Sequence, residues 1–172
     1  MTISELGSVG ELIGAIATVA TLAYLAIQIR STTRAVRTAS AQSVHESFAT
    51  WYRMLASDAE LSDLTTKGLR DYSSLSESEK GRFVSVAMAI LLCSQDAFIK
   101  WGEGSLSQDL WSGWEFVVMN LLLAPGGKDF WKERAYLFGA EFREHVDGDI
   151  MKRKPHPDAK PLGAFSLGAV AD

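Results

Sequence analysis

Apolar and polar positions divide the chain into one long uncharged run followed by several amphipathic segments of helix length. The uncharged run is Leu12–Ile29, LIGAIATVATLAYLAIQI, eighteen residues without Asp, Glu, Lys or Arg. At about 1.5 Å per residue, a helix of this length covers roughly 27 Å, close to the bilayer hydrocarbon core of about 30 Å. The pattern predicts a membrane-spanning helix, with a buried central helix of a soluble bundle as the alternative.

Charged residues are unequally distributed on the two sides of this run. Glu5 and Glu11 precede it, whereas Arg30, Arg34 and Arg37 follow it. A secretory signal peptide begins with a basic segment, so we do not expect this run to be cleaved. Because the basic side of a span usually faces the cytoplasm, we predict a single pass through the membrane with the N-terminus outside and the following domain in the cytoplasm.

Small and polar side chains gather on one face of this predicted helix, given about 100° of rotation per residue. The residues of this face, the seam, are Gly10, Gly14, Ala17, Thr21, Tyr24 and Gln28. Small side chains let helix backbones approach closely, and hydroxyl or amide groups can hydrogen-bond between helices. The seam is therefore predicted to associate with a second copy of the chain, with another membrane protein or with the protein's own domain. Several copies closed around the seam would line a pore.

The opposite face of the same helix is apolar and continues into Arg30, Arg34 and Arg37. Long basic side chains near the end of a span can extend to the lipid phosphates while their stems stay in the apolar layer. We therefore expect these three arginines at the membrane interface.

Amphipathic segments beyond residue 37 predict an all-α cytoplasmic domain. Val44, Phe48, Trp51, Tyr52 and Leu55 recur at helical spacing, so the first helix is expected to continue into this domain. Further helices are predicted at residues 58–68, 77–101, 108–123, 128–138 and 141–146. The segment 77–101 is the most apolar of them and is expected to form the centre of the bundle.

Polar residues mark the predicted starts of three of these helices. Ser57 or Asp58 can cap the first, and Ser107 can cap the helix that starts at residue 108. Ser76 and Glu79 have the spacing of a capping box, in which each side chain accepts a hydrogen bond from the backbone of the other residue.

Three segments are predicted from these patterns: an anchor and juxtamembrane helix (1–37), a helical domain (38–147) and an extended or flexible tail (148–172). Within the domain, Pro125-Gly126-Gly127 predicts a turn. The prolines of the tail, Pro155, Pro157 and Pro161, and the basic cluster Lys152-Arg153-Lys154 indicate solvated chain. Weak attraction of that cluster to anionic lipid is the alternative.

Composition narrows the classes of function. Apolar residues make up 47% of the chain, which is enough for a folded core. The net charge of −4 argues against a nucleic-acid-binding protein, which is normally basic. Cys93 is the only cysteine, so it forms no intramolecular disulfide, and its apolar surroundings in the sequence predict a buried, inert thiol.

Candidate residues for catalysis or metal binding are few. A di-metal centre could be imagined from His45, Glu46, Asp96, Glu115, Glu144 and His145. The Glu-x-x-His pairs that such centres use do not occur in the sequence. Asp96 is more simply explained by an ion pair with Lys100, four residues later. Neither a nucleophile elbow nor a phosphate-binding Gly-rich loop is present, so we predict no enzymatic activity, no metal and no cofactor.

The chain resembles a family of small bacterial proteins without an assigned function. The shared segments are Gly10–Ala17, Tyr24–Arg30, Ser57–Leu61, the Pro-Gly-Gly sequence and Glu141–Asp147. The resemblance covers about residues 8–147. It implies an N-terminal helix in a bacterial inner membrane, followed by a helical cytoplasmic domain.

Three functions are compatible with these patterns. The favoured one is a membrane-anchored helical interaction module, either homo-oligomeric or a subunit of a membrane complex. The second is an oligomeric ion channel lined by the seam. The third is a soluble helical bundle in which the first helix is buried.

Overall fold

The computed structural model describes residues 3–153, and within this range the chain forms helices and no strands. The α-helices are α1 (Ile3–Ser57), α2 (Ala59–Arg70), α3 (Glu77–Gly102), α4 (Gln108–Leu122), α5 (Pro125–Arg134) and α6 (Ala140–Gly148). Three short 3₁₀ helices connect or follow them: η1 (Tyr72–Ser74), η2 (Ala135–Leu137) and η3 (Ile150–Lys152). The predicted all-α class is confirmed.

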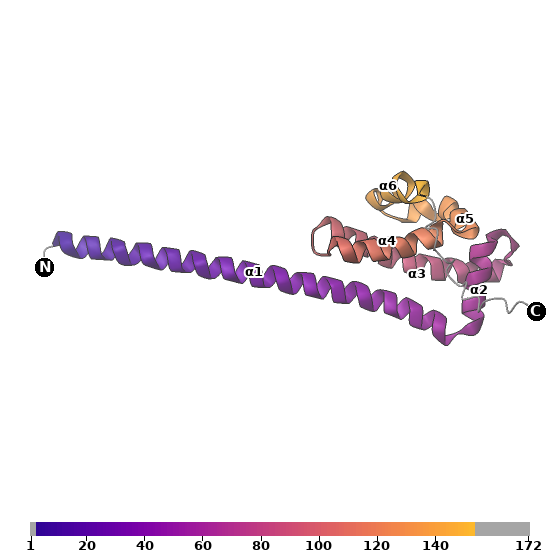
Figure 1. Ribbon diagram of the computed structural model, residues 1–172, viewed down its shortest axis with the longest axis horizontal. Coiled ribbons are helices and arrows are strands. Elements are labelled where there is room, and N and C mark those ends of the chain that lie inside the picture. The colour runs from indigo at the N-terminus through magenta and orange to yellow at the C-terminus, as the bar shows by residue number, and fades with distance from the viewer. Residues whose placement is uncertain (1–2, 154–172) are drawn as a thin grey trace, which may run out of the picture. The chain divides into compact units, whose positions relative to one another are not determined.

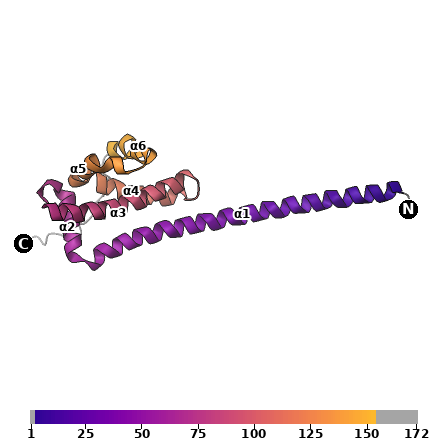
Figure 2. The ribbon, with the colours of Figure 1, turned by 180° about the vertical axis from the view of Figure 1, so that it is seen from behind.

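The chain separates into two compact units, Met1–Ala39 and Ser40–Asp172. The described part of the first unit is a single helical segment, the N-terminal part of α1. The second unit contains the last part of α1 and the helices that follow it. Within this unit, α3 and α4 lie side by side in both views of the ribbon (Figures 1 and 2).

Local capping interactions fix the starts of three helices. The side chains of Asp58, Ser76 and Ser107 each accept a backbone hydrogen bond from the first turn of α2, α3 and α4, respectively. At Ser76 the capping box is complete, because the Glu79 carboxylate accepts a hydrogen bond from the Ser76 backbone at 2.7 Å. The predicted caps are confirmed, with Asp58 rather than Ser57 capping α2.

The Glu79 carboxylate in this capping box gives the fold a specific response to acid. Hydrogen bonds from Lys67 (2.8 Å) and Ser76 lower the pKa of Glu79 from 4.5 to about 2. A lowered pKa in the folded state stabilises the fold fully above pH 4.5, and this stabilisation is lost as the pH falls towards 2. We therefore expect Glu79→Gln to lower the melting temperature at pH 7 and to have little effect near pH 2.

Thermal unfolding of the full chain in detergent, followed by circular dichroism between pH 2 and pH 7, measures this response. Glu77→Gln is the control, because the Glu77 side chain lies in the same turn of α3 and is 94% exposed. If Glu79→Gln lowers the melting temperature by the same amount at every pH, the Glu79 carboxylate is not the source of the stabilisation.

One face of α3 forms the centre of the hydrophobic core. Phe83, Val86, Ile90 and Leu91 on this face are all at most 4% exposed. The prediction that this helix forms the centre of the bundle holds for one face only, because its other face reaches the surface. Leu92 and Ile99, for example, are exposed.

The last part of α1 packs on this core through the amphipathic stripe that the sequence indicates. Val44, Phe48 and Trp51 are buried, and the indole Nε1 of Trp51 donates a hydrogen bond to the backbone oxygen of Val86 at 3.1 Å. Tyr52, at the edge of the stripe, is exposed. The stripe therefore joins residues 40–57 to α3.

The predicted Pro-Gly-Gly turn is wrong, because Pro125 is the first residue of α5. Proline is tolerated at this position, since its missing N–H would have no partner within the helix. The two glycines allow close backbone contacts. A Cβ at Gly126 would lie 1.8 Å from the Gly68 carbonyl oxygen, and a Cβ at Gly127 would lie 1.8 Å from that of Leu121. The glycines therefore let α5 pack closely on α2 and on the end of α4.

The predicted extended tail also differs from the structure where the two overlap. Gly148 is still part of α6, residues 150–152 form η3, and the Ile150 side chain is fully buried. The basic cluster is likewise not simply solvated, because Arg153 forms ion pairs. The remaining part of the predicted tail, residues 154–172, lies outside the described residues.

Candidate functional site

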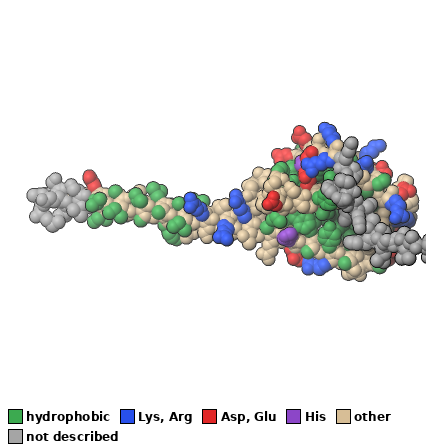
Figure 3. Space-filling model, viewed as in Figure 1, with side chains coloured by type: hydrophobic (Ala, Val, Ile, Leu, Met, Phe, Trp, Pro, Cys, Tyr) green, Lys and Arg blue, Asp and Glu red, His purple; other side chains and the backbone are tan. Residues whose placement is uncertain are grey.

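The apolar run in α1 exposes large aliphatic side chains along its length. Leu12, Ile16, Val19, Leu22 and Ile27 are between 61% and 67% exposed. Figure 3 shows hydrophobic side chains in green along this part of the helix. An 18-residue window of α1 has a mean hydropathy of 2.0 and none of it is buried, whereas the window found in α3 has 1.5 and is 39% buried. By length and composition both helices could cross a membrane, but α3 uses one face for the core of the second unit.

Polar side chains within the apolar run find hydrogen-bond partners on their own helix. The hydroxyls of Thr18 and Thr21 donate to the backbone oxygens of Gly14 and Ala17, at 2.9 and 2.8 Å. The Gln28 amide donates to the Tyr24 hydroxyl at 2.7 Å. These bonds lower the cost of placing the polar groups in a bilayer, where an unpaired polar group costs several kcal/mol.

The seam residues all lie on α1, and two of them are glycines for which no packing reason exists within the described structure. A Cβ added at Gly10 or Gly14 would meet no atom within 4 Å. This contrasts with Gly68 in α2, where a Cβ would lie 2.2 Å from the Phe83 ring. That the seam contacts another helix stays a prediction.

The three arginines that follow the run are exposed, and none forms an ion pair with a residue that the structure describes. The nearest acidic residues in the sequence are Glu11 and Glu46. The guanidinium groups of Arg30, Arg34 and Arg37 are therefore available for an anion from outside the described chain.

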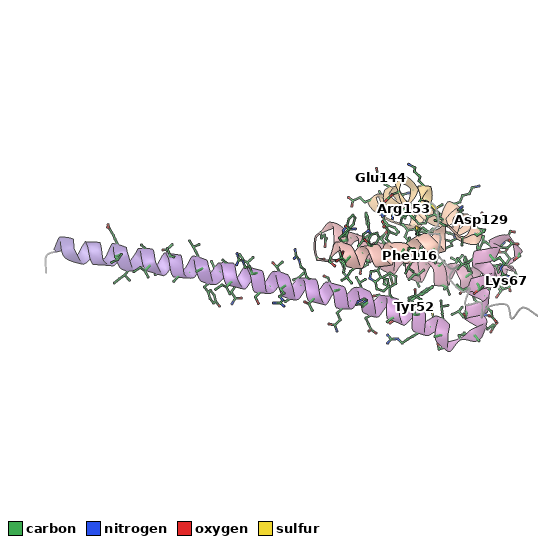
Figure 4. All side chains as sticks on the ribbon, viewed as in Figure 1. Tyr52, Lys67, Phe116, Asp129, Glu144 and Arg153 are labelled. Carbon is green, nitrogen blue, oxygen red and sulfur yellow. The ribbon has the colours of Figure 1, made fainter. Side chains whose placement is uncertain are left out.

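A second candidate site is the Glu115 cluster, which consists of Glu115, His145, Asp149 and Arg153. Glu115 on α4 is 8% exposed, and its two carboxylate oxygens have different partners. Oε1 is hydrogen-bonded to His145 Nε2 at 2.8 Å, and Oε2 accepts a hydrogen bond from Arg153 Nη1 at 2.7 Å. Arg153, labelled in Figure 4, also donates from Nε to Asp149 at 3.1 Å and forms an ion pair with it.

Aromatic rings hold the histidine of this cluster in place. The His145 ring stacks on Phe98 with 4.9 Å between centroids and lies 5.7 Å from Trp111.

Hydrogen bonds from Arg153 hold the pKa of Asp149 below its ordinary value. The cluster therefore ties α6 and η3 to α4 by charge-assisted hydrogen bonds.

The Glu115 cluster has the donor types of a metal site, because one ligand atom each from Glu115, His145 and Asp149 lies within 4.8 Å of the others. Imidazole and carboxylate ligands suit zinc, iron or manganese. However, the Arg153 guanidinium already donates to both carboxylates. The arrangement therefore fits an internal ion-pair network better than a metal centre.

The fold brings together only some of the six residues that the sequence offered as candidate ligands of a di-metal centre. Glu115 and His145 meet, whereas Asp96 pairs with Lys100 at 2.7 Å, as predicted for it. His45 lies edge-on to the Trp114 ring and takes no part in the ion pairs of the Glu115 cluster. Of the remaining candidates, Glu46 pairs with Arg53 and Glu144 is exposed.

The sequence reasoning missed Asp149 and Arg153, which complete the Glu115 cluster. Their signal was the spacing of four residues from His145 to Asp149 and from Asp149 to Arg153, which places charges along one side of a helical segment. The expectation of an extended chain beyond Gly148 hid this pattern.

Cys93, the lone cysteine, is half-buried on α3. Burial raises the pKa of its thiol, so the neutral form predominates at neutral pH. The predicted burial of Cys93 is therefore only partly right, whereas the raised pKa favours the unreactive thiol form.

Comparison of the chain with protein-family models, curated proteins and solved structures found no match. The resemblance to small bacterial membrane proteins therefore stays a prediction, and the function has to be inferred from the residues themselves.

Proposed function

We propose that this chain is a membrane-anchored helical interaction module, held in the bilayer by residues 12–29 of α1. The exposed apolar run carries the proposal. Transfer of one large aliphatic side chain out of water contributes roughly 1.5–3 kcal/mol, so the run as a whole would contribute on the order of 10 kcal/mol on insertion. The hydrogen bonds of Thr18, Thr21 and Gln28 within the helix support insertion further.

The charges at the two ends of the run support one orientation. Glu11 lies before the run, and Arg30, Arg34 and Arg37 lie after it without acidic partners in the described chain. Arginines directly after the apolar run would lie at the membrane interface and contact lipid phosphates. By the positive-inside rule, the second unit would then be in the cytoplasm. The N-terminus would lie on the outer side of a bacterial inner membrane.

The seam supports association with another helix in the membrane, either a second copy of the chain or a different membrane protein. Glycine within a helix costs about 0.8–1 kcal/mol relative to alanine. Gly10 and Gly14 carry this cost without a close packing contact within the described structure. Close approach of a second helix to the seam would explain both of them.

Membrane fractionation tests the anchor. The full chain is expected to stay in the membrane pellet after an alkaline carbonate wash. Ile16→Arg combined with Val19→Arg should release it, because each arginine in the middle of a span costs roughly 2.5–3.5 kcal/mol. Leu92→Arg with Ile99→Arg is the matched control, since both residues are exposed on α3. Recovery of the unmodified chain in the soluble fraction would overturn the proposal.

Native mass measurement in detergent tests the seam separately. Gly14→Leu with Thr21→Leu is expected to lower the oligomeric mass, because two large side chains would keep the partner helix at a distance. Ala23→Leu with Ala26→Leu, on the opposite face, should leave the mass unchanged. An unaltered mass for the first pair of substitutions would remove the seam from the proposal and leave the anchor standing.

A further inference from the structure

A cavity of about 310 Å³ lies in the second unit, where η1, α3 and α5 meet. The polar residues that line it are Tyr72, Glu77, Lys80, Glu133 and Arg134. Most of its lining is therefore charged or hydroxyl-bearing, and the cavity takes no part in the proposed membrane anchor or seam.

Arg134 lines this cavity, and no other residue of the described chain pairs with its guanidinium. The Nε atom of Arg134 is buried and has no hydrogen-bond partner. The Arg134 guanidinium forms no ion pair with any side chain that the structure describes. A buried donor without an acceptor costs roughly 1–3 kcal/mol, and such groups are rare in folded proteins. Arg143 Nε is also buried without a partner, but Arg143 does not line the cavity.

The other polar groups of the cavity already have partners. Lys80 lies 3.3 Å from a carboxylate oxygen of Glu77. The Tyr72 hydroxyl donates a hydrogen bond to Glu133 at 3.2 Å. Burial and the neighbouring Glu133 charge raise the pKa of Tyr72, so its hydroxyl stays protonated and remains a donor at neutral pH. Arg134 is thus the charged group of the lining whose partner is missing.

We propose that Arg134 binds the carboxylate of a small molecule in this cavity. A guanidinium presents parallel N–H groups that match the two oxygens of a carboxylate. The Nη groups of Arg134 are not buried, so a carboxylate in the cavity can reach them and supply the ion pair that the described chain does not. Lys80 and Arg134 are balanced by Glu77 and Glu133, so the lining has no net formal charge. A singly charged carboxylate therefore suits the cavity better than a doubly charged phosphate.

Nuclear magnetic resonance of the full chain in detergent micelles tests this site, with sodium acetate as the probe and sodium chloride at matched ionic strength as the reference. The Nε–H resonance of Arg134 is expected to shift and saturate with acetate, while that of Arg143 stays in place. The backbone amide of Gly81, which also lines the cavity, serves as a second reporter.

Variants separate binding at Arg134 from a general effect of salt. Arg134→Gln should abolish the saturable shift at Gly81, and Arg143→Gln should retain it. Arg134→Lys keeps the positive charge but loses the two parallel N–H donors of the guanidinium, so it should weaken acetate binding by about tenfold or more. A shift that rises linearly, that chloride reproduces, or that is equal at Arg143 would overturn the proposal. Tighter binding of inorganic phosphate than of acetate would overturn the carboxylate assignment.

Discussion

Gly126→Ala is expected to lower the free energy of unfolding by about 3 kcal/mol or more, at the upper end of the cost of overpacking a core. The added Cβ would lie 1.8 Å from the carbonyl oxygen of Gly68 and 2.9 Å from its carbonyl carbon. Both are backbone atoms, so no side-chain rotation can relieve the contact. α5 would have to move away from α2, which would open the core between them. Thermal unfolding of the full chain in detergent, followed by circular dichroism, measures the loss.

Gly113→Ala is the matched control for this substitution. Gly113 lies within α4, and a Cβ there would meet no atom within 4 Å. Alanine at this position should stabilise the helix by up to about 1 kcal/mol. Equal melting temperatures for the two variants would show that α2 and α5 do not approach as closely as the structure has them.

Glu115→Ala is the second substitution expected to have a large effect, lowering the free energy of unfolding by about 2 kcal/mol. It removes the acceptor for both His145 and Arg153. Loss of one partner from a buried ion pair costs roughly 3–5 kcal/mol, but Arg153 is 40% exposed and can turn to water, which reduces the cost. The same unfolding measurement applies.

Asp96→Ala provides the comparison for Glu115→Ala. Asp96 pairs with Lys100 one helical turn away, and its side chain is 50% exposed. An exposed pair of this kind contributes less than about 1 kcal/mol. Equal losses for Asp96→Ala and Glu115→Ala would mean that the Glu115 cluster does not hold α6 and η3 to α4.

Helix starts could be predicted from the sequence because capping depends on neighbours within one turn. Asp58, Ser76 and Ser107 each act on a backbone group three residues later, so their chemistry is visible in the sequence. The Pro-Gly-Gly segment was misassigned for the opposite reason. The requirement for Gly126 comes from Gly68, which is distant in sequence, and no local pattern contains that contact.

The Glu115 cluster shows the same limit at a candidate site. Glu115 and His145 could be selected as chemically interesting, but which groups surround them depends on how α4 packs beside α6. Arg153 lies in a segment whose prolines and basic residues indicate solvated chain, so its ion pairs could not be read from composition. The proposed roles of the seam in helix association and of the three arginines at the membrane interface follow mainly from the spacing of these residues in the sequence.

The hydrogen bonds within the apolar run bear on how tightly the proposed anchors would associate. Because Thr18, Thr21 and Gln28 are already bonded within their own helix, a single anchor would be tolerated in lipid. The association of two anchor helices would then be stabilised mainly by close packing at Gly10 and Gly14. Such an assembly would be governed by mass action in two dimensions, with monomers at low surface density and complexes as the protein-to-lipid ratio rises. The abundance of the chain in its membrane would thereby set its state of assembly.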